Sequence, residues 1–124
     1  MKNAINIAER KPVWVALSEI YLDTELQDAD FTNIALTISK SPYGFEEVRQ
    51  IDKYEVFPVL YTNLLSVAGE WAGFNEEWLI DAISDSINKR NKANQLVLEA
   101  SYASFKWMYK EAWEKLERKY LESK

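Results

Sequence analysis

The apolar residues in the last third of the chain recur with the period of an α-helix. At about 100° per residue, one set of them falls within roughly 80° of a common direction. The members of this set are Leu98, Tyr102, Phe105, Met108, Tyr109, Ala112, Trp113, Leu116 and Tyr120. The pattern predicts one long helix over about residues 93–121, with this face in a hydrophobic core.

A second apolar set lies on the opposite side of the first half of this helix. It comprises Leu96, Ala100, Ala103 and Trp107. A helix that is apolar nearly all round is either central in a bundle or presents its second face to a partner. We expect the central position, because an exposed tryptophan is the rarer arrangement.

Two helices are predicted before residue 42. Pro12 suits the first turn of a helix over about residues 12–22, and either Asp28 or Asp30 can cap a second helix. This second helix should stop before Pro42, which disfavours helical geometry at the residue before it. The residues expected to face inward are Val13, Trp14, Leu17, Ile20 and Tyr21 in the first helix, and Phe31, Ile34, Ala35 and Ile38 in the second.

The next stretch predicts two further helices separated at a proline. Gly44 leads into a third helix, with Glu46 and Glu47 in the first turn, where the helix dipole favours negative charge. Pro58 lacks a backbone donor and is expected to break or kink the chain at that point, so that a fourth helix covers about residues 58–67. The inward residues of the third helix are Phe45, Val48, Ile51 and Tyr54.

The segment LLSVAGEWAGFN, residues 64–75, places Glu70 and Trp71 between two glycines. Gly69 suits the position just past the end of the fourth helix, and Asn75 suits the N-cap of a fifth. On this interpretation Glu70 and Trp71 form a tight connection, with Trp71 folded onto the core. The alternative is that the two side chains are a displayed binding site. The fifth helix then continues with Leu79, Ile83 and Ile87 inward.

These elements predict an all-α, single-domain bundle of five to six helices over residues 1–124, with a long C-terminal helix. The chain has 124 residues, of which 48% are hydrophobic, so it is large enough to bury one core. It contains no cysteine and no histidine. Disulfides, zinc–thiolate sites and histidine general bases are therefore excluded.

The charge distribution argues against nucleic acid as a partner. Residues 1–87 carry six basic and fifteen acidic residues, whereas residues 88–124 carry nine basic and five acidic residues. Phosphate contacts need clustered lysine and arginine, which the acidic body lacks. The N-terminus does not read as a secretory signal, and the longest apolar stretch, residues 56–68, is shorter than the roughly 20 residues of a membrane helix. We therefore expect a cytoplasmic protein that does not bind membranes.

No sequence motif points to catalysis, a cofactor or a metal. The acidic string of Asp23, Glu25, Asp28 and Asp30 lacks the glycine and distal glutamate of a calcium-binding loop, which favours a solvated loop with a capping aspartate. There is no glycine-rich phosphate loop and no serine elbow. An enzyme would have to use carboxylates, in a pocket that joins Glu70 or Asp23 to another carboxylate.

Three stretches resemble a family of small bacterial proteins known only as a domain of unknown function. They are KPVWVALSEIYLDTEL at residues 11–26, SPYGFEEVRQI from residue 41 and YEVFPVLYTNLLSVAGEWAGFNEEWL from residue 54. The resemblance covers most of the chain up to about residue 80 and implies no catalytic residues. By class, a small, acidic, cysteine-free helical chain also looks like the immunity proteins, which bind a cognate toxin domain and block it.

The leading hypothesis is a non-catalytic binding protein, an immunity protein that neutralises a basic toxin domain through an acidic surface. The predicted partner-binding residues are Asp23, Glu25, Asp28, Asp30, Glu70, Trp71, Glu76, Glu77 and Asp81, with Trp71 as the aromatic anchor. The first alternative is a homo-oligomeric adaptor, such as a homodimer, that uses the second face of the C-terminal helix. The second alternative is a carboxylate-dependent enzyme.

Overall fold

The structure is a computed structural model that describes residues 6–21, 26–64 and 76–123, except for the side chains of residues 61–64. In these ranges seven α-helical segments join into five continuous helices, and no strand occurs. They are α1 (Ile7–Ser18) with the 3₁₀ turn η1 (Glu19–Tyr21); α2 (Asp28–Lys40); α3 (Phe45–Ile51), the π turn η2 (Asp52–Val56) and α4 (Phe57–Leu64); α5 (Glu76–Lys89); and α6 (Lys92–Phe105), the 3₁₀ turn η3 (Lys106–Tyr109) and α7 (Lys110–Glu122). The predicted all-α fold with a long C-terminal helix is confirmed.

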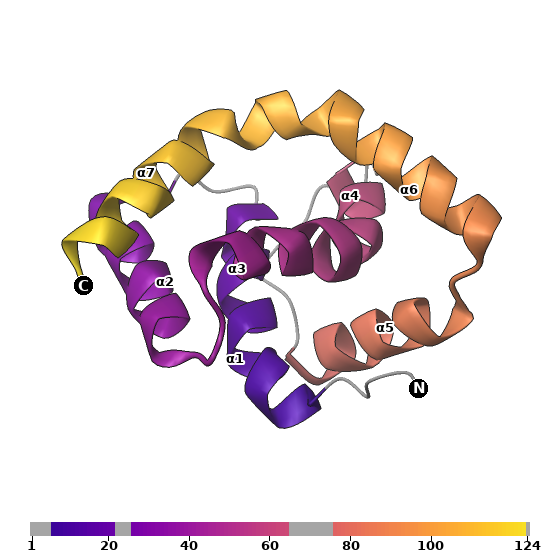
Figure 1. The fold of residues 1–124 in the computed structure, drawn as a ribbon, viewed down its shortest axis with the longest axis horizontal. Coiled ribbons are helices and arrows are strands. Elements are labelled where there is room, and N and C mark those ends of the chain that lie inside the picture. The colour runs from indigo at the N-terminus through magenta and orange to yellow at the C-terminus, as the bar shows by residue number, and fades with distance from the viewer. Residues whose placement is uncertain (1–5, 22–25, 65–75, 124) are drawn as a thin grey trace.

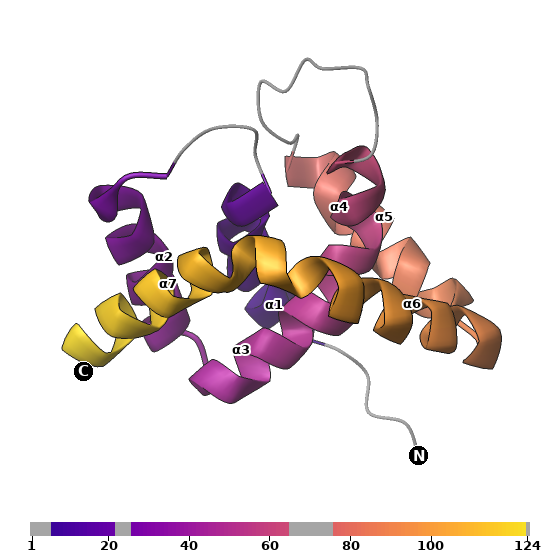
Figure 2. The ribbon, with the colours of Figure 1, turned by 90° about the horizontal axis from the view of Figure 1, so that it is seen from above.

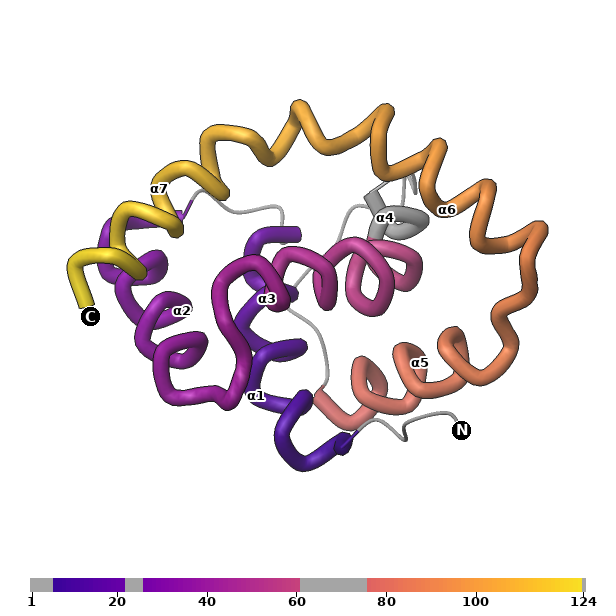
Figure 3. Tube along the Cα trace, viewed as in Figure 1, coloured from indigo at the N-terminus to yellow at the C-terminus, as the bar shows by residue number. Residues whose placement is uncertain are grey.

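The C-terminal helix forms an arc along the outside of the molecule (Figure 1), and its Cα trace runs from α6 into α7 without a break (Figure 3). Helix α2 lies under one end of the arc and α5 under the other, while α1 and the α3–α4 helix cross the middle. Seen from above, the arc passes across α1 and α3 (Figure 2). None of the helices in the described ranges is long and apolar enough to cross a membrane.

The core is built from the faces that helical periodicity predicts. Fully buried side chains include Trp14, Leu17, Ile34, Ile38, Val48, Phe57, Leu60, Leu79, Ile83 and Leu116. Burying a large apolar side chain contributes about 1.5–3 kcal/mol, so these residues provide the main driving force of folding. The predicted inward residues of α1, α2 and α3 are confirmed as buried, apart from Tyr54, which is half-buried.

The first helix starts earlier than the predicted range of 12–22. Its N-cap is Asn6, whose side-chain oxygen accepts a 3.1 Å hydrogen bond from the Glu9 amide. Pro12 therefore lies in the second helical turn and removes the donor that would bond to the Ala8 carbonyl. Both Ala8 and Pro12 are exposed, so water can take the place of that hydrogen bond.

In both α2 and α3, an acidic side chain in the first turn accepts a hydrogen bond from the backbone amide of the N-cap residue. The Gln27 amide donates to Oδ2 of Asp30 at 2.8 Å, and the Gly44 amide donates to Oε1 of Glu47 at 3.1 Å. The prediction that Asp28 or Asp30 is the N-cap of α2 is therefore wrong in position, because Gln27 occupies it and Asp30 caps from inside the first turn. Helix α2 ends at Lys40, before Pro42 as predicted.

Pro58 does not break the helix that contains it. Helix α3 passes into α4 through the π turn, in which the Phe57 amide donates to the Asp52 carbonyl five residues back. The wider π turn accommodates the extra residue immediately before the proline. Helix α4 accordingly starts at Phe57, whereas the predicted end at residue 67 lies outside the described residues.

The expectation that the C-terminal helix is central is wrong. Its predicted inner face does pack on the core, apart from the exposed Met108, but Leu96 and Trp107 are 69% and 70% exposed. The reason is geometric, because the helix bends around the outside of the bundle and changes to 3₁₀ winding at residues 106–109. Its second apolar face is consequently left in solvent.

Candidate functional site

The predicted partner-binding residues fall into two groups. Asp23, Glu25, Glu70 and Trp71 lie outside the described residues, together with Gly69 and Asn75, so the two interpretations of the 64–75 segment stay predictions. The same holds for the enzyme hypothesis, which requires a pocket at Glu70 or Asp23. Asp28, Asp30, Glu76, Glu77 and Asp81 are described, at the N-terminal ends of α2 and α5.

The structure brings part of this second group together across α1. A groove of about 290 Å³ is lined by residues of α1 and η1 from Lys11 to Glu19, by Asn33 and other residues of α2, and by Glu76 of α5. Burial raises the pKa of Glu19, and the nearby Asp30 carboxylate raises it further. Glu19 and Glu76 therefore line the same groove, and Asp30 lies near its Glu19 side chain.

Asp28, Glu77 and Asp81 are exposed and do not line the groove. Within the described ranges, no group of three or more carboxylates is arranged to hold a metal ion. The groove also includes Lys11. The predicted acidic residues that the structure describes therefore form a discontinuous acidic surface at the N-terminal ends of α2 and α5.

The π turn buries two carboxylates that helical patterning did not predict. Glu55 accepts hydrogen bonds from Nε and Nη2 of Arg10 at 3.0 and 2.8 Å, and from Nε1 of Trp14 at 2.7 Å. Arg10 also donates to the Tyr43 hydroxyl at 3.2 Å. Both oxygens of Glu55 are thus paired with a cation and a buried donor. Such a pair holds α1 against η2 and offers no acceptor to a ligand.

Asp52, the other buried carboxylate of the π turn, is only half satisfied. Its side chain is 1% exposed, and its Oδ1 accepts a 2.8 Å hydrogen bond from the Tyr21 hydroxyl. Among the described residues, no donor lies in hydrogen-bonding geometry to its Oδ2, although the Tyr102 hydroxyl is close enough to interact with the carboxylate. Burial raises the pKa of Asp52 to about 7, although Tyr21, Arg49 and Tyr102 each lower it. Asp52 is therefore poised between its two protonation states near neutral pH.

Asp52 also lines a cavity of about 470 Å³ between α3–η2 and the outer arc. The walls carry four aromatic rings, those of Tyr102, Trp107, Tyr109 and Trp113. They also carry charged side chains of both signs, those of Arg49, Lys106, Lys110, Glu114 and Glu117. Burial raises the pKa of Tyr102 and Tyr109 to about 12, so both hydroxyls stay protonated at neutral pH. A cavity of this volume suits a small molecule.

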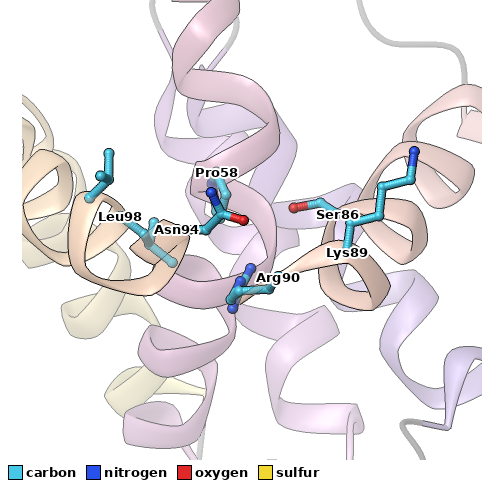
Figure 4. Close-up of a pocket in the computed structure, with 7 residues that line it drawn as sticks. Pro58, Ser86, Lys89, Arg90, Asn94 and Leu98 are labelled. Carbon is cyan, nitrogen blue, oxygen red and sulfur yellow. The ribbon is translucent and has the colours of Figure 1, made fainter. Parts of the chain in front are cut away.

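A second cavity, of about 310 Å³, lies under the α5–α6 turn (Figure 4). Arg90 reaches from this turn toward the helix that carries Pro58, and its guanidinium donates to the Tyr54 carbonyl. In a regular α-helix that carbonyl would accept from residue 58, but proline has no donor. Arg90 therefore satisfies a carbonyl that Pro58 leaves unpaired, and its role is structural.

Sequence reasoning missed both buried carboxylates, although one signal points to them. Asp52 and Glu55 stand seven and ten residues after Phe45, which is helical spacing on one face. Two charges on an apolar face indicate either partners in the core or a site. The sequence alone does not say which carboxylate has the partners.

The comparisons with known proteins bear on family membership. The model of a family described as a domain of unknown function, DUF7079, matches residues 8–119. No curated protein matches the chain, and no solved structure matches it. Because the family model covers nearly the whole fold, from α1 through most of α7, this chain belongs to the DUF7079 family.

Proposed function

We propose that this protein is a non-catalytic binding module of the immunity type, which docks a basic protein domain on the acidic ends of α2 and α5. The observation that carries the proposal is that Glu19 and Glu76 line one groove and that the Asp30 carboxylate lies close enough to raise the pKa of Glu19. Exposed carboxylates of Asp28, Glu77 and Asp81 extend the negative charge beyond it. Such a surface speeds the encounter with a cationic cleft and fixes its orientation.

The proposed mechanism is occlusion without turnover. A nuclease-type toxin presents a cationic cleft to its substrate, and an acidic protein that covers the cleft excludes that substrate. Because rim charges act mainly on the association rate, binding should weaken steeply as salt rises. The chemical class of the partner is thus a basic toxin domain.

The test is co-expression of this protein with each neighbouring reading frame, followed by affinity measurement on any complex that purifies. The charge-reversal variant is Glu76→Lys with Glu77→Lys. Its matched control is Glu46→Lys with Glu111→Lys, which reverses two exposed first-turn charges on other helices. At low salt we expect at least about a tenfold loss of affinity for the first variant and little for the control. Equal losses for both variants, or no basic partner, would overturn the proposal.

A second candidate function, a homo-oligomeric adaptor, is favoured by the outer face of α6. Leu96 of α6 and Trp107 of η3, which belong to the second apolar face, are both more than half exposed, as is the neighbouring Val97. Exposed apolar patches often mark interaction sites. If the wild type is a dimer, Leu96→Glu with Trp107→Ser should make it monomeric in light scattering. A wild type that is a stable monomer would remove this candidate.

A further inference from the structure

The cavity beside Asp52 is separate from the acidic groove, and it shares Trp107 with the exposed apolar face of the C-terminal helix. Its floor includes a carboxylate that the π turn places inside the protein, where only 1% of the residue is exposed to solvent. Its walls come from α3 and η2 on one side and from α6, η3 and α7 on the other. Residues distant in the sequence therefore line one cavity that is open to solvent on the side of Trp107.

The unpartnered Oδ2 of Asp52 is the feature that points to a ligand. Leaving a buried acceptor without a donor is destabilising, more so when it is charged. Glu55, three residues along in the same π turn, shows that this fold can pair both oxygens of a buried carboxylate. Asp52 lacks the second donor, and a ligand with an N–H group can supply it.

The walls specify the shape of that ligand. The rings of Tyr102, Trp107, Tyr109 and Trp113 surround the cavity, and aromatic walls favour a flat ring that stacks or meets them edge to face. Trp113 is itself held in place, since it meets Phe45 edge to face at 5.7 Å between ring centroids. The cavity is thus shaped by aromatic surfaces on rigid helices.

The basic side chains of the cavity indicate the charge of that ligand. The Arg49 guanidinium lies 5.2 Å from the centroid of the Trp113 ring. Of the ion pairs found in the described ranges, none involves Arg49 or Lys106, whereas Lys110 pairs with Glu114 at 3.9 Å. Glu114 and Glu117 also line the cavity, but neither of these described residues forms an ion pair with Arg49 or Lys106. These two cations can therefore meet a negatively charged substituent on the ligand.

We propose that this cavity binds a flat aromatic anion whose ring N–H donates to Oδ2 of Asp52. The ring lies among Tyr102, Trp107 and Tyr109, and the anionic group meets Arg49 and Lys106. The proposal goes beyond the acidic docking surface and shares no residue with it, so either can fail without the other.

Three probes separate the elements of the proposal. Indole-3-acetate has the flat ring, the N–H and the negative charge. Benzofuran-3-acetate keeps the shape and charge but has no N–H, and indole-3-acetamide keeps the ring and N–H but is neutral. By calorimetry we expect indole-3-acetate to bind with a dissociation constant of about 10⁻⁴ M. Each of the other two probes should bind at least about tenfold more weakly.

Protein variants assign these differences to residues. In Asp52→Asn the side-chain amide offers N–H groups of its own, so indole-3-acetate and benzofuran-3-acetate should bind with equal affinity. Lys106→Gln should reduce the preference for the charged probe over the amide, whereas Lys92→Gln, an exposed lysine on α6 outside the cavity, should leave it unchanged.

Ionisation gives an independent readout on the wild type. An N–H donor at Oδ2 stabilises the carboxylate, so indole-3-acetate should bind more tightly at pH 8 than at pH 6 and release protons when it binds. The charged and titratable groups that face Asp52 are Tyr21, Arg49, Tyr102 and Tyr109. The raised pKa of each of these tyrosines keeps its hydroxyl neutral in this range. Equal wild-type affinities for indole-3-acetate and benzofuran-3-acetate, or no binding of either up to about 10 mM, would overturn the proposal without use of any variant.

Discussion

The Tyr21 hydroxyl donates a 2.8 Å hydrogen bond to Oδ1 of Asp52, which links the end of the first helix to the start of the π turn. Both side chains are buried. Burial and the neighbouring carboxylate raise the pKa of Tyr21 well above its ordinary value, so the donor is never lost at physiological pH. The ionisation of Asp52 therefore decides how much this contact contributes to stability.

The first prediction concerns stability against pH. The pKa of Asp52 is about 7 in the folded protein and 3.8 as its ordinary value, so the folded state binds more protons between these limits. The contribution of Asp52 to stability accordingly falls as pH rises from about 4 to about 7, and the full cost, on the order of 4 kcal/mol, is present above that.

Asp52→Asn should remove this cost. In urea unfolding, the difference in free energy of unfolding between the variant and the wild type should move in favour of the variant by several kcal/mol from about pH 4.5 to about pH 8. The control Glu46→Gln alters an exposed carboxylate and should parallel the wild type. A constant difference between Asp52→Asn and the wild type would contradict the buried, ionisable Asp52.

The second prediction tests the donor. Tyr21→Phe keeps the ring and removes the hydroxyl, so Oδ1 of Asp52 loses its donor. We expect a loss of about 1–3 kcal/mol in the free energy of unfolding, larger at pH 8 than at pH 5, because hydrogen bonds to a charged acceptor are stronger. Tyr109→Phe is the matched control, since the Tyr109 ring packs on Tyr21 at 5.0 Å between centroids without donating to Asp52. A similar loss in both variants would mean that ring packing dominates.

The third prediction concerns the paired carboxylate. Glu55→Gln leaves the half-buried Arg10 without a counter-charge, although the amide oxygen can still accept from Trp14. Removing one partner of a buried ion pair costs about 3 kcal/mol or more, and chemical denaturation measures that loss. Asp85→Asn breaks an exposed pair with Lys89 and should cost less than about 0.5 kcal/mol. Equal effects would show that the Arg10 pair is no better shielded from water than the exposed one.

Helical periodicity was sufficient to predict the buried faces of the helices. It did not predict where an α-helix changes to π or 3₁₀ winding. The stripe Phe31, Ile34, Ala35 and Ile38 is buried as predicted, because an amphipathic helix has one way to face a core. The π turn depends instead on how Pro58, Arg90 and the buried carboxylates are accommodated together. That arrangement is tertiary, and no local pattern specifies it.

The candidate sites likewise contain one part that the sequence could predict and one part that it could not. Exposed carboxylates such as Asp28 and Glu77 could be placed at helix starts from capping preferences. Asp52 was missed because charged residues are seldom fully buried, so the sequence argument assigned the inward positions to apolar residues alone. The cavity beside it requires the bend of the C-terminal helix, which a regular period of 3.6 residues does not contain.

The fourth prediction separates the two tryptophans of the outer arc. Trp113 is 5% exposed, whereas Trp107 is 70% exposed. Trp113→Ala should therefore cost about 3–5 kcal/mol of stability through lost burial and a cavity, and Trp107→Ala less than about 0.5 kcal/mol. Thermal or urea unfolding of the two variants checks this. A large loss for Trp107→Ala would mean that its ring is covered, for example in a dimer, and light scattering would then distinguish that case.

The fifth prediction concerns the carbonyl that Pro58 leaves unpaired. Arg90→Ala should cost about 1–3 kcal/mol in the wild-type background, because the Tyr54 carbonyl loses its donor. In a Pro58→Ala background the amide of residue 58 is restored and can donate to that carbonyl, so the same Arg90→Ala change should cost clearly less. The double-mutant cycle measures the coupling as the difference between the two costs of Arg90→Ala. Additive effects would mean that Arg90 and Pro58 act independently, and Arg90 would then be available as a cation in the cavity under the α5–α6 turn.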